Sequence, residues 1–484
     1  MKVTFVYPGI AMIGFNCLGG QSHDTISINL GLGYISSYLK KNSNHTVDLI
    51  DLRDILGWGH YEIELKNRNP DVVGIYCNTV NFENSVKSAE VAKKIGSHVV
   101  MGGPHVTLDP ESLLKTGLVD TVIIGEGEIS FLRVMEDLSS GMTPDRIIQG
   151  EKIEDLDDIP FPDRDLYNIN RILNGPGIFP YPNRYIGIMA SRGCYYNCAF
   201  CQPLEKMIFG RKVRTRSVEN IIVEVKDVIK KYNANFIMFE CDTLTTKKYW
   251  ALELCREMKN IPVAWGAQSR SDTIDDELAA AMHAAGCMVL FIGFESGSQR
   301  ILKLLRKGIT PEQSIEAGRI CRRNKILIFA NYMLGVPTET VEDLEMTYSL
   351  IKAIQPELHS PAYFSPIPGS DLFDYCSEND LIKTSAYEEY VRNPIHEKIK
   401  GIDYRLLDQY RLKISDCSKS FWREPYFARH VFARWLFLLR KGFVRTFIRE
   451  LAVNLPIIVK PLRRVFHRFI KGTGKNEEKY YPGT

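Results

Sequence analysis

Three cysteines lie close together in the segment SRGCYYNCAFCQP: Cys194, Cys198 and Cys201. Thiolates are the protein ligands of iron–sulfur clusters, and three on one short loop can converge on a single cubane. One iron then keeps an open coordination position, where the amine and carboxylate of an amino acid can chelate. A zinc knuckle is the alternative, but structural zinc usually has four protein ligands, and no fourth Cys or His lies nearby in the sequence. The spacing therefore predicts an iron–sulfur cluster.

The elements that must position this loop form a repeated strand–helix series. The loop follows an apolar run at 185–191, and helical patterns separate most of the later runs with strand character. Six parallel units of this kind can close into a partial (β/α)6 barrel, whose active site lies at the carboxyl ends of its strands. The predicted barrel occupies residues 181–400, with strands at 185–191, 235–241, 263–269, 287–295, 327–335 and 361–367.

A second strand–helix series precedes the barrel. Strand and helix patterns alternate through residues 1–145, which predicts an α/β, doubly wound, Rossmann-like domain with ligands beyond the carboxyl ends of its strands. Residues 146–180 are rich in acids and prolines and read as a linker. Residues 401–484 form a helical, basic C-terminal region. The predicted strands of the first domain are 2–8, 46–52, 71–77, 98–103 and 121–127.

The cluster segment resembles the radical S-adenosylmethionine (SAM) superfamily. The signature of that family combines this cysteine spacing with an aromatic residue before the last cysteine, here Phe200. The resemblance implies a 4Fe–4S cluster that donates an electron to bound SAM. Cleavage would give methionine and a 5′-deoxyadenosyl radical that abstracts hydrogen from the substrate.

The resemblance also implies residues that hold SAM. Glu240 and Asp242, in FECD, take the place of the polar motif that meets the methionine amine, although the usual glycines are missing. Arg270 would face the methionine carboxylate; a surface or inter-helix ion pair is its alternative role. Glu295, followed by Ser296, would accept hydrogen bonds from the ribose hydroxyls. An ion pair at the end of the barrel is the alternative for Glu295.

A turn further along the barrel resembles the family segment that packs near adenine. In MLGVPTE it contains Gly335, Pro337 and Glu339. A small residue at this position permits close approach of the backbone to the ligand.

The first domain resembles the cobalamin-binding domains fused to radical SAM enzymes, through GLGYISSYLK, PDVVGIYCNTV, VVMGGPHVTLDPE and VDTVIIGEGE in that order. Glycines at strand ends would let the backbone approach a corrin ring or a phosphate tail. A ligand-free α/β domain that only shapes the substrate pocket is the alternative. The Asp-x-His-x-x-Gly motif that supplies a lower cobalt ligand in many methyltransferases is missing from residues 1–60. The predicted cobalamin contacts are Gly102, Gly103, His105, Gly125, Glu126 and Gly127.

The composition limits the binding partners and the cellular compartment that we expect. The net charge of +3 gives no reason to expect nucleic-acid binding. The first residues do not read as a secretory signal, and no long uninterrupted apolar run predicts a transmembrane helix. With 11 cysteines and no signal, a disulfide framework is not expected, so we predict a cytoplasmic protein.

The C-terminal region, from Arg423 to Lys471, interleaves basic with aromatic and aliphatic residues. A basic amphipathic helix can lie in a membrane interface, which would make the protein membrane-associated through a peripheral contact. The alternative is a lid packed on the barrel. Pro456 and Pro461 would break or kink any helix here.

Together, the two resemblances point to a cobalamin-dependent radical SAM enzyme, a group that includes methyltransferases and the anaerobic magnesium-protoporphyrin monomethyl ester cyclase. The leading hypothesis is methylation of an unactivated carbon of a small-molecule or lipid-like organic substrate, through the 5′-deoxyadenosyl radical and methylcobalamin. A second hypothesis is oxidation or cyclisation without methyl transfer, and a third is a non-catalytic cobalamin or redox sensor. A flavodoxin or ferredoxin would supply electrons.

Overall fold

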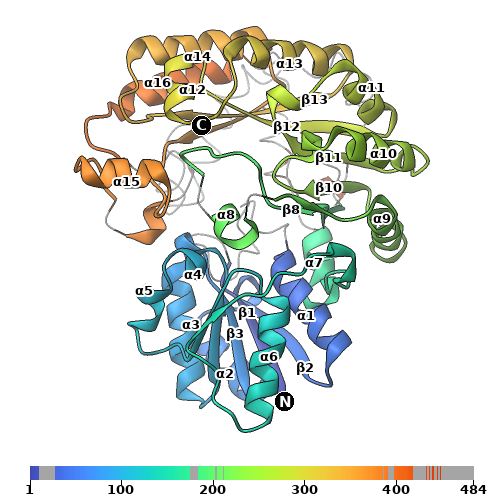
Figure 1. The fold of residues 1–484 in the computed structure, drawn as a ribbon, viewed down its shortest axis with the longest axis vertical. Coiled ribbons are helices and arrows are strands. Elements are labelled where there is room, and N and C mark those ends of the chain that lie inside the picture. Colours follow the sequence, from blue (N-terminus) through green and yellow to red (C-terminus); the bar gives the residue numbers. More distant parts are fainter. Residues whose placement is uncertain are drawn as a thin grey trace.

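The computed structural model describes residues 1–9, 28–174, 184–201, 204–210, 212–384, 386–390 and 397–417, with single positions between 432 and 447. Two parallel sheets of six strands dominate it, one from each half of the chain (Figure 1). This confirms the predicted α/β class, with a doubly wound domain followed by a partial barrel. Most of the basic C-terminal region lies outside the described residues.

The first sheet has the strand order β2-β1-β3-β4-β5-β6, all parallel. The crevice where the strand order reverses lies between β1 and β3, and such crevices are where open α/β sheets bind ligands. The strands are β1 Lys2–Tyr7, β2 Thr46–Asp51, β3 Val72–Tyr76, β4 His98–Gly102, β5 Thr121–Ile124 and β6 Ile147–Gln149. The helices are α1 Leu30–Asn42, α2 Trp58–Arg68, α3 Phe82–Lys94, α4 Pro104–Leu108, α5 Pro110–Leu114 and α6 Glu128–Ser139.

The second sheet has the order β14-β13-β12-β11-β10-β7, again all parallel. Its strands are β7 Tyr185–Met189, β10 Phe236–Glu240, β11 Ala264–Ser269, β12 Cys287–Glu295, β13 Leu327–Leu334 and β14 Leu358–Tyr363. The helices between and after them are α9 Val218–Tyr232, α10 Lys248–Met258, α11 Asp276–Ala284, α12 Gln299–Leu304, α13 Pro311–Arg323, α14 Val341–Ile354, α15 Asp371–Glu378 and α16 Tyr404–Ser415.

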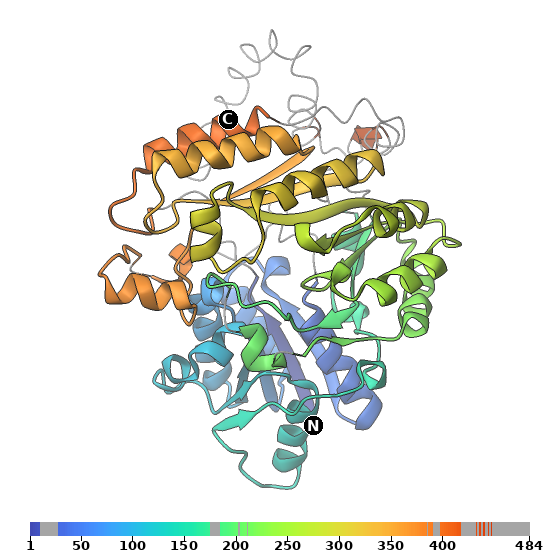
Figure 2. The ribbon, with the colours of Figure 1, turned by 45° about the horizontal axis from the view of Figure 1, so that its top comes forward.

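Helix α9 illustrates why these segments fold as they do. Ser217 caps its first turn by accepting a hydrogen bond from the Asn220 N–H, and Asn233 ends it in a left-handed conformation. Its apolar residues recur at helical spacing, so Ile221, Val225 and others form one face that packs into the barrel core. Helices α13, α14 and α16 cover the same outer face of the sheet (Figure 2).

Two elements depart from the predicted pattern. Strand β6 lies inside 146–180, the stretch predicted as a linker, and pairs with β5 to give the first sheet a sixth strand. A short hairpin, β8 Ser191–Arg192 with β9 Arg214–Thr215, brackets the cluster loop and helix α8 Leu204–Phe209. Both elements are too short to show a periodic pattern.

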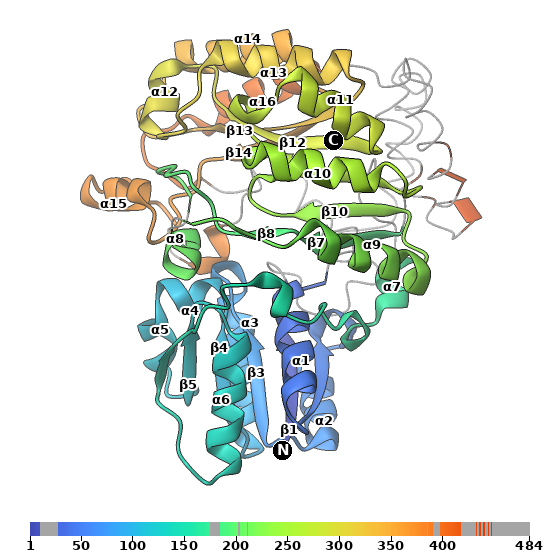
Figure 3. The same ribbon diagram turned by 45° about the vertical axis from the view of Figure 1, so that its right-hand side comes forward.

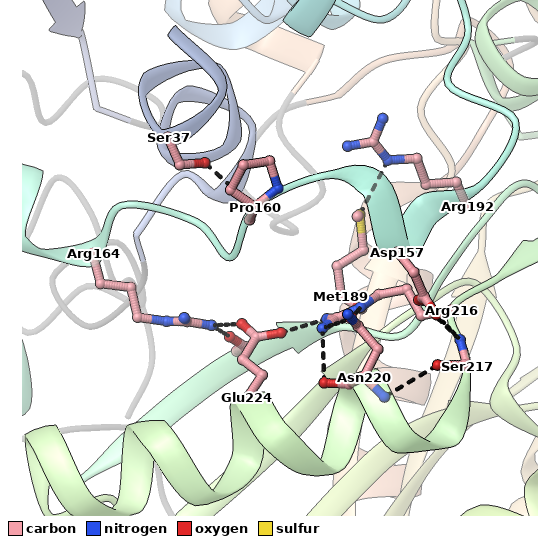
Figure 4. Close-up of polar contacts among 11 residues, drawn as sticks. Ser37, Asp157, Pro160, Arg164, Met189, Arg192, Arg216, Ser217, Asn220 and Glu224 are labelled. Carbon is pink, nitrogen blue, oxygen red and sulfur yellow. Dashed lines mark hydrogen bonds and ion pairs between the residues drawn. The ribbon is translucent and has the colours of Figure 1, made fainter. Parts of the chain in front are cut away.

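The chain between the two sheets is anchored on both sides. It contains a 3-10 turn at Arg164–Leu166 and helix α7 Ile169–Leu173. Arg164 reaches from this segment to Glu224 on α9, at 2.6 Å, and Arg216 meets the same carboxylate from the other side (Figure 4). All three side chains are buried. The carboxyl ends of the first sheet therefore face the barrel (Figure 3).

No helix among the described residues combines the length and the apolar composition needed to cross a bilayer.

Candidate active site between the two sheets

The cluster loop starts directly after β8. The side chains of Cys194 and Cys198 are half-buried and that of Cys201 is exposed. Cys198 and Cys201 form one turn, in which the Cys201 N–H donates to the Cys198 carbonyl at 3.2 Å. Ala199, inside this turn, donates to the Leu305 carbonyl at 2.8 Å, which fixes the loop to the end of α12.

Two positive groups, Lys307 and Arg270, lie near the Cys198 thiol. The Cys201 thiol hydrogen bonds to Cys198 and lowers the pKa of Cys198, and the charges of Lys307 and Arg270 act in the same direction. Arg270 Nη1 lies 3.9 Å from Cys198 Sγ. A thiolate is the form that ligates iron, so this charge favours the ligating form of Cys198. For the other two thiols the pKa is raised, by burial and two nearby carboxylates for Cys194, and by the interaction with Cys198 and burial for Cys201.

The three thiols fit a cluster by number and accessibility. Within the described part of the chain, no three Cys, His, Asp or Glu side chains are already arranged as a metal site. The cysteines must therefore turn toward one another to hold iron. A short, partly exposed loop allows such a rotation, whereas a packed core would not.

Glu295, predicted to meet the ribose, ends β12 in an ion pair. Its carboxylate lies 2.8 Å from Lys307 Nζ, and both side chains are buried. A β-bulge between Gly293 and Glu295 and a left-handed φ of 61° at Glu295 turn the side chain back along the strand. A Cβ at Gly293 would lie only 2.3 Å from Glu295 Oε1, so the glycine makes room for this pair.

Lys307 was missed at the sequence level. It follows α12, in a stretch with no periodic pattern, and lies twelve positions along the chain from its partner. Its ammonium also lies 5.8 Å from the centre of the Phe200 ring, in the cluster loop. A buried cation therefore sits between the cluster loop and the predicted ribose ligand.

Arg270 is engaged by protein groups. It pairs with Asp272 at 2.9 Å, donates to the Lys307 carbonyl at 2.7 Å and stacks 3.5 Å from the centre of the Tyr196 ring. Arg270 is buried in this local ion pair, which is therefore not the surface or inter-helix pair that was its alternative role. Its place beside Cys198 is still compatible with a contact to the methionine carboxylate.

Ser296 and Gly335 lie in packed surroundings. The Ser296 hydroxyl is 3.1 Å from that of Thr347 on α14 and is fully buried. Gly335 has a left-handed φ of 77°, and a Cβ there would lie 2.7 Å from Leu407 on α16. Glu339 accepts hydrogen bonds from the Gly335 and Val336 N–H groups, so it closes this turn. For these residues, contact with SAM stays a prediction.

The two acids of FECD have different partners. Glu240 accepts a hydrogen bond from the Tyr185 hydroxyl at 2.8 Å, and burial raises its pKa. Asp242 interacts instead with Glu205 on α8, a half-buried carboxyl group that the sequence did not single out. Burial, together with Asp242, raises the pKa of Glu205 to about 8. Asp242 also acts electrostatically on Cys194, which places it on the side of the cluster loop.

The predicted cobalamin contacts gather at the carboxyl edge of the first sheet. Gly103 links β4 to α4 with a φ of 118°, and a Cβ there would lie 2.6 Å from the Cys77 carbonyl. Gly102 has no backbone or side-chain atom closer than 3.8 Å to such a Cβ, which leaves room beside it. The close turn and the open space fit a large flat ligand at this edge.

His105 is buried in the same turn. Its ring nitrogens lie 3.4 Å from the Thr79 hydroxyl and 3.1 Å from the Ser112 hydroxyl. Burial lowers its pKa to about 4. Tyr387, in a 3-10 turn at Tyr387–Tyr390 after the barrel, packs on the His105 ring with centroids 4.8 Å apart. His105 therefore links the first domain to the chain that follows the barrel.

Glu126, predicted to bind cobalamin, joins the domains instead. Its carboxylate pairs with Arg192 of β8 at 2.8 Å and with Arg214 of β9, all with buried side chains. Glu128 pairs with Arg192 at 2.5 Å. Since both Glu126 oxygens are engaged, a cobalamin contact at this loop would use backbone groups.

Gly125 and Gly127 flank Glu126. The Gly125 N–H donates to the Thr107 hydroxyl at 3.1 Å. Gly127 precedes α6 and lies against Ile35 of α1, where a Cβ would come within 2.8 Å of the side chain. These contacts belong to the domain itself, and cobalamin contact here stays a prediction.

A cavity of about 310 Å³ lies between the two sheets. It is lined from the first domain by Tyr7 and Tyr76 at the ends of β1 and β3, and from the barrel by Tyr185 and Glu240. It thus opens at the crevice where the first sheet reverses its strand order. The other lining residues are Ile28, Asn29, Leu30, Gly31, Arg164, Ile169, Ile172, Ile186 and Gly187.

Comparisons with known proteins agree with this geometry. Residues 188–351 match the radical SAM superfamily and residues 18–135 match the B12 binding domain. A protein of Pyrococcus horikoshii named as an uncharacterized methyltransferase is 32% identical over 381 residues, covering 75% of this chain and 81% of that protein. The anaerobic magnesium-protoporphyrin IX monomethyl ester cyclase of Rubrivivax gelatinosus is 25% identical, with 81% of this chain and 72% of the cyclase covered.

Among solved structures, the radical SAM methyltransferase TsrM of Kitasatospora setae has a similar fold. The TM-score is 0.64 at 15% identity, covering 86% of this chain and 89% of TsrM. The likeness concerns the fold and the order of the domains. With a radical SAM match, a B12 binding match and a relative 32% identical over most of its length, the chain belongs to the family of cobalamin-binding radical SAM enzymes.

Proposed function

We propose that this enzyme methylates an unactivated carbon of a small organic substrate, with SAM as the source of both the methyl group and the 5′-deoxyadenosyl radical. A bound cluster would supply the electron that cleaves SAM, and a bound cobalamin would carry the methyl group. The observation that carries the proposal is the placement of the cavity. It is lined at once by the carboxyl ends of β1 and β3 and by barrel strands β7 and β10.

The residues of this chain would mainly bind and orient. Cys194, Cys198 and Cys201 would hold the cluster, and Asp242 lies on the same side, where its carboxylate could accept from the methionine amine. Glu295, close to Lys307, would accept from the ribose hydroxyls. Holding reactants in fixed geometry and away from water is the main contribution of a protein to radical chemistry.

The experiment is anaerobic reconstitution of the full chain with iron, sulfide and cobalamin, followed by incubation with SAM and dithionite. We expect bound corrin in the absorption spectrum and release of 5′-deoxyadenosine. Cys194→Ala should abolish release of the nucleoside, and Cys417→Ala, outside the loop, is the matched control. Nucleoside release that persists in Cys194→Ala would contradict the proposal.

The products separate methylation from a second candidate. S-adenosylhomocysteine formed alongside 5′-deoxyadenosine supports methyl transfer. 5′-Deoxyadenosine alone favours oxidation or cyclisation, a possibility supported by the likeness to the cyclase. We further propose a flavodoxin or ferredoxin as the physiological reductant. The described cysteines are all free, in line with a reducing compartment such as the cytoplasm.

A further inference from the structure

The cavity between the sheets combines aromatic rings with a carboxylate. Three tyrosines line it, and one acid, Glu240, comes from the barrel. Gly187 of β7 lies directly over this acid, where a Cβ would be 3.1 Å from Glu240 Cγ. The glycine therefore gives the Glu240 side chain its space beside β7.

Within the described ranges, Glu240 has no cationic side chain as a partner. Its partner among the described residues is the Tyr185 hydroxyl, at 2.8 Å, and no Lys, Arg or His of that part of the chain forms an ion pair with it. Arg164, the basic residue in the cavity lining, pairs with Glu224 at 2.6 Å and donates to the Gly187 carbonyl at 2.8 Å. A buried carboxylate is costly unless it is protonated or meets a cation.

The tyrosines complete a surface that suits a cation. Tyr7 and Tyr76 lie with ring centroids 5.8 Å apart, at the ends of neighbouring strands. Aromatic ring faces attract ammonium groups, more strongly where water is excluded. Tyr7 already has such a partner, since the Arg53 guanidinium lies 4.8 Å from its ring centre. A carboxylate and aromatic rings in one cavity are the features by which proteins bind organic amines.

The size of the cavity limits its ligand. At about 310 Å³ it lies at the lower end of the range for small-molecule sites. A compact molecule fits this volume, whereas a tetrapyrrole, the type of substrate named for the cyclase relative, is too large.

We propose that this cavity is the substrate pocket and that it takes a small organic molecule with a protonated amine, which Glu240 binds. The inference rests on the proposed function, because it treats the cavity as the place where the substrate meets both cofactors. It gives the two acids of FECD different roles: Asp242 acts beside the cluster loop, and Glu240 binds the substrate. Tyr185 is a positioning residue, since its hydroxyl orients the Glu240 carboxylate.

The test uses three probes of similar shape on the full chain reconstituted with cluster and cobalamin: phenethylamine, 2-phenylethanol and the slightly larger 3-phenylpropanoate. Binding is followed by saturation-transfer NMR titration. We expect the amine to bind about tenfold or more tightly than the alcohol, because it forms a charge-assisted hydrogen bond, and the anion to bind most weakly.

Substitutions test whether Glu240 and this cavity determine the preference for the amine. Glu240→Gln keeps the shape of the side chain and should weaken binding of the amine about tenfold, whereas the affinity for the alcohol should change little. Ile169→Trp, from α7, should exclude all three probes by filling the cavity. Glu219→Gln, an exposed acid on α9, is the matched control and should not alter binding. Circular dichroism checks that each variant is folded.

Several outcomes would overturn the inference. They are equal binding of amine and alcohol, absence of binding by any probe, tighter binding of the anion, or unchanged amine affinity in Glu240→Gln. None of these affects 5′-deoxyadenosine release by the wild-type enzyme. Failure of that release, in contrast, would overturn the proposed function and not the measured preference for amines.

Discussion

At the scale of single residues, the site contains more buried charge than a barrel core needs. Lys307 and Glu295 pair at 2.8 Å beside the cluster loop, with side-chain exposures of 8% and 9%. Such a pair contributes little net stability when intact, because both charges lose their hydration. We therefore expect Lys307 to position the Glu295 carboxylate beside the predicted ribose site.

Lys307→Met should destabilise the protein by about 3 kcal/mol, because it leaves the Glu295 carboxylate buried without a cation. Urea denaturation of the cluster-free protein measures this. The matched control is Lys400→Met, which removes an exposed pair with Asp380 and should cost at most about 1 kcal/mol. Adding Glu295→Gln to Lys307→Met should recover part of the loss. Equal effects of the two lysine substitutions would refute the assignment.

His105 should make the stability depend on pH. Burial lowers its pKa from the ordinary 6.5 to about 4, so between these values the unfolded chain binds a proton that the folded protein does not. The free energy of unfolding therefore falls as the pH is lowered from about 6.5 to about 4.

His105→Gln removes this contribution. The stability lost by the variant between pH 6.5 and pH 4 should be about 3 kcal/mol smaller than that lost by the wild type. Urea denaturation at the two pH values measures it. An identical loss in wild type and variant would show that His105 does not titrate as its burial requires.

At the scale of elements, the turn from β4 to α4 shapes the predicted cobalamin edge. Gly103→Ala combines an unfavourable left-handed φ of 118° with a Cβ only 2.6 Å from the Cys77 carbonyl. We expect destabilisation of about 2 kcal/mol or more and weaker cobalamin binding, measured from corrin absorbance after gel filtration.

Gly59→Ala is the control for that substitution. Gly59 lies in α2, where a Cβ meets no atom within 4 Å, so alanine should stabilise the helix by about 0.5–1 kcal/mol and leave corrin binding unchanged. If both alanine variants retain corrin equally, the turn does not shape the site.

At the scale of the whole molecule, buried ion pairs join the two sheets. Glu126 of the first domain lies between Arg192 and Arg214 of the β8–β9 hairpin, and Arg164, Arg216 and Glu224 form a second cluster. Cys194, the first cysteine of the cluster loop, lies two residues after Arg192, so the pairing that joins the domains also fixes the start of the loop.

Glu126→Gln should separate the unfolding of the two domains. The buried Arg214 guanidinium would lose its only carboxylate among the described residues, whereas Arg192 would keep Glu128, and we expect a cost of about 3–5 kcal/mol. Calorimetry should show one transition for the wild type and two for the variant. Glu136→Gln, on the exposed face of α6, is the control and should keep a single transition. A single, unshifted transition in Glu126→Gln would contradict this coupling.

Local sequence patterns were enough to predict the class of fold and the cluster loop. Apolar runs such as that of β12 and capped amphipathic helices such as α9 are short-range features, so their positions follow from neighbouring residues. The strand predicted at 361–367 was placed late, because β14 is Leu358–Tyr363 and its first residues are only half-buried. β6, with three residues, was missed for lack of length.

The site was only partly predictable. Cys194, Cys198 and Cys201 are recognisable because a cluster loop is contiguous, so its spacing alone carries the chemistry. The sequence thus determined the radical half of the enzyme and the order of its domains. The partners of Glu126, Glu240 and Glu295 come from 12 to 88 residues away and depend on how the sheets meet. Only the tertiary structure therefore decided which acids join the domains and which face a cavity, because burial and pairing, not residue type, set the role of a carboxylate.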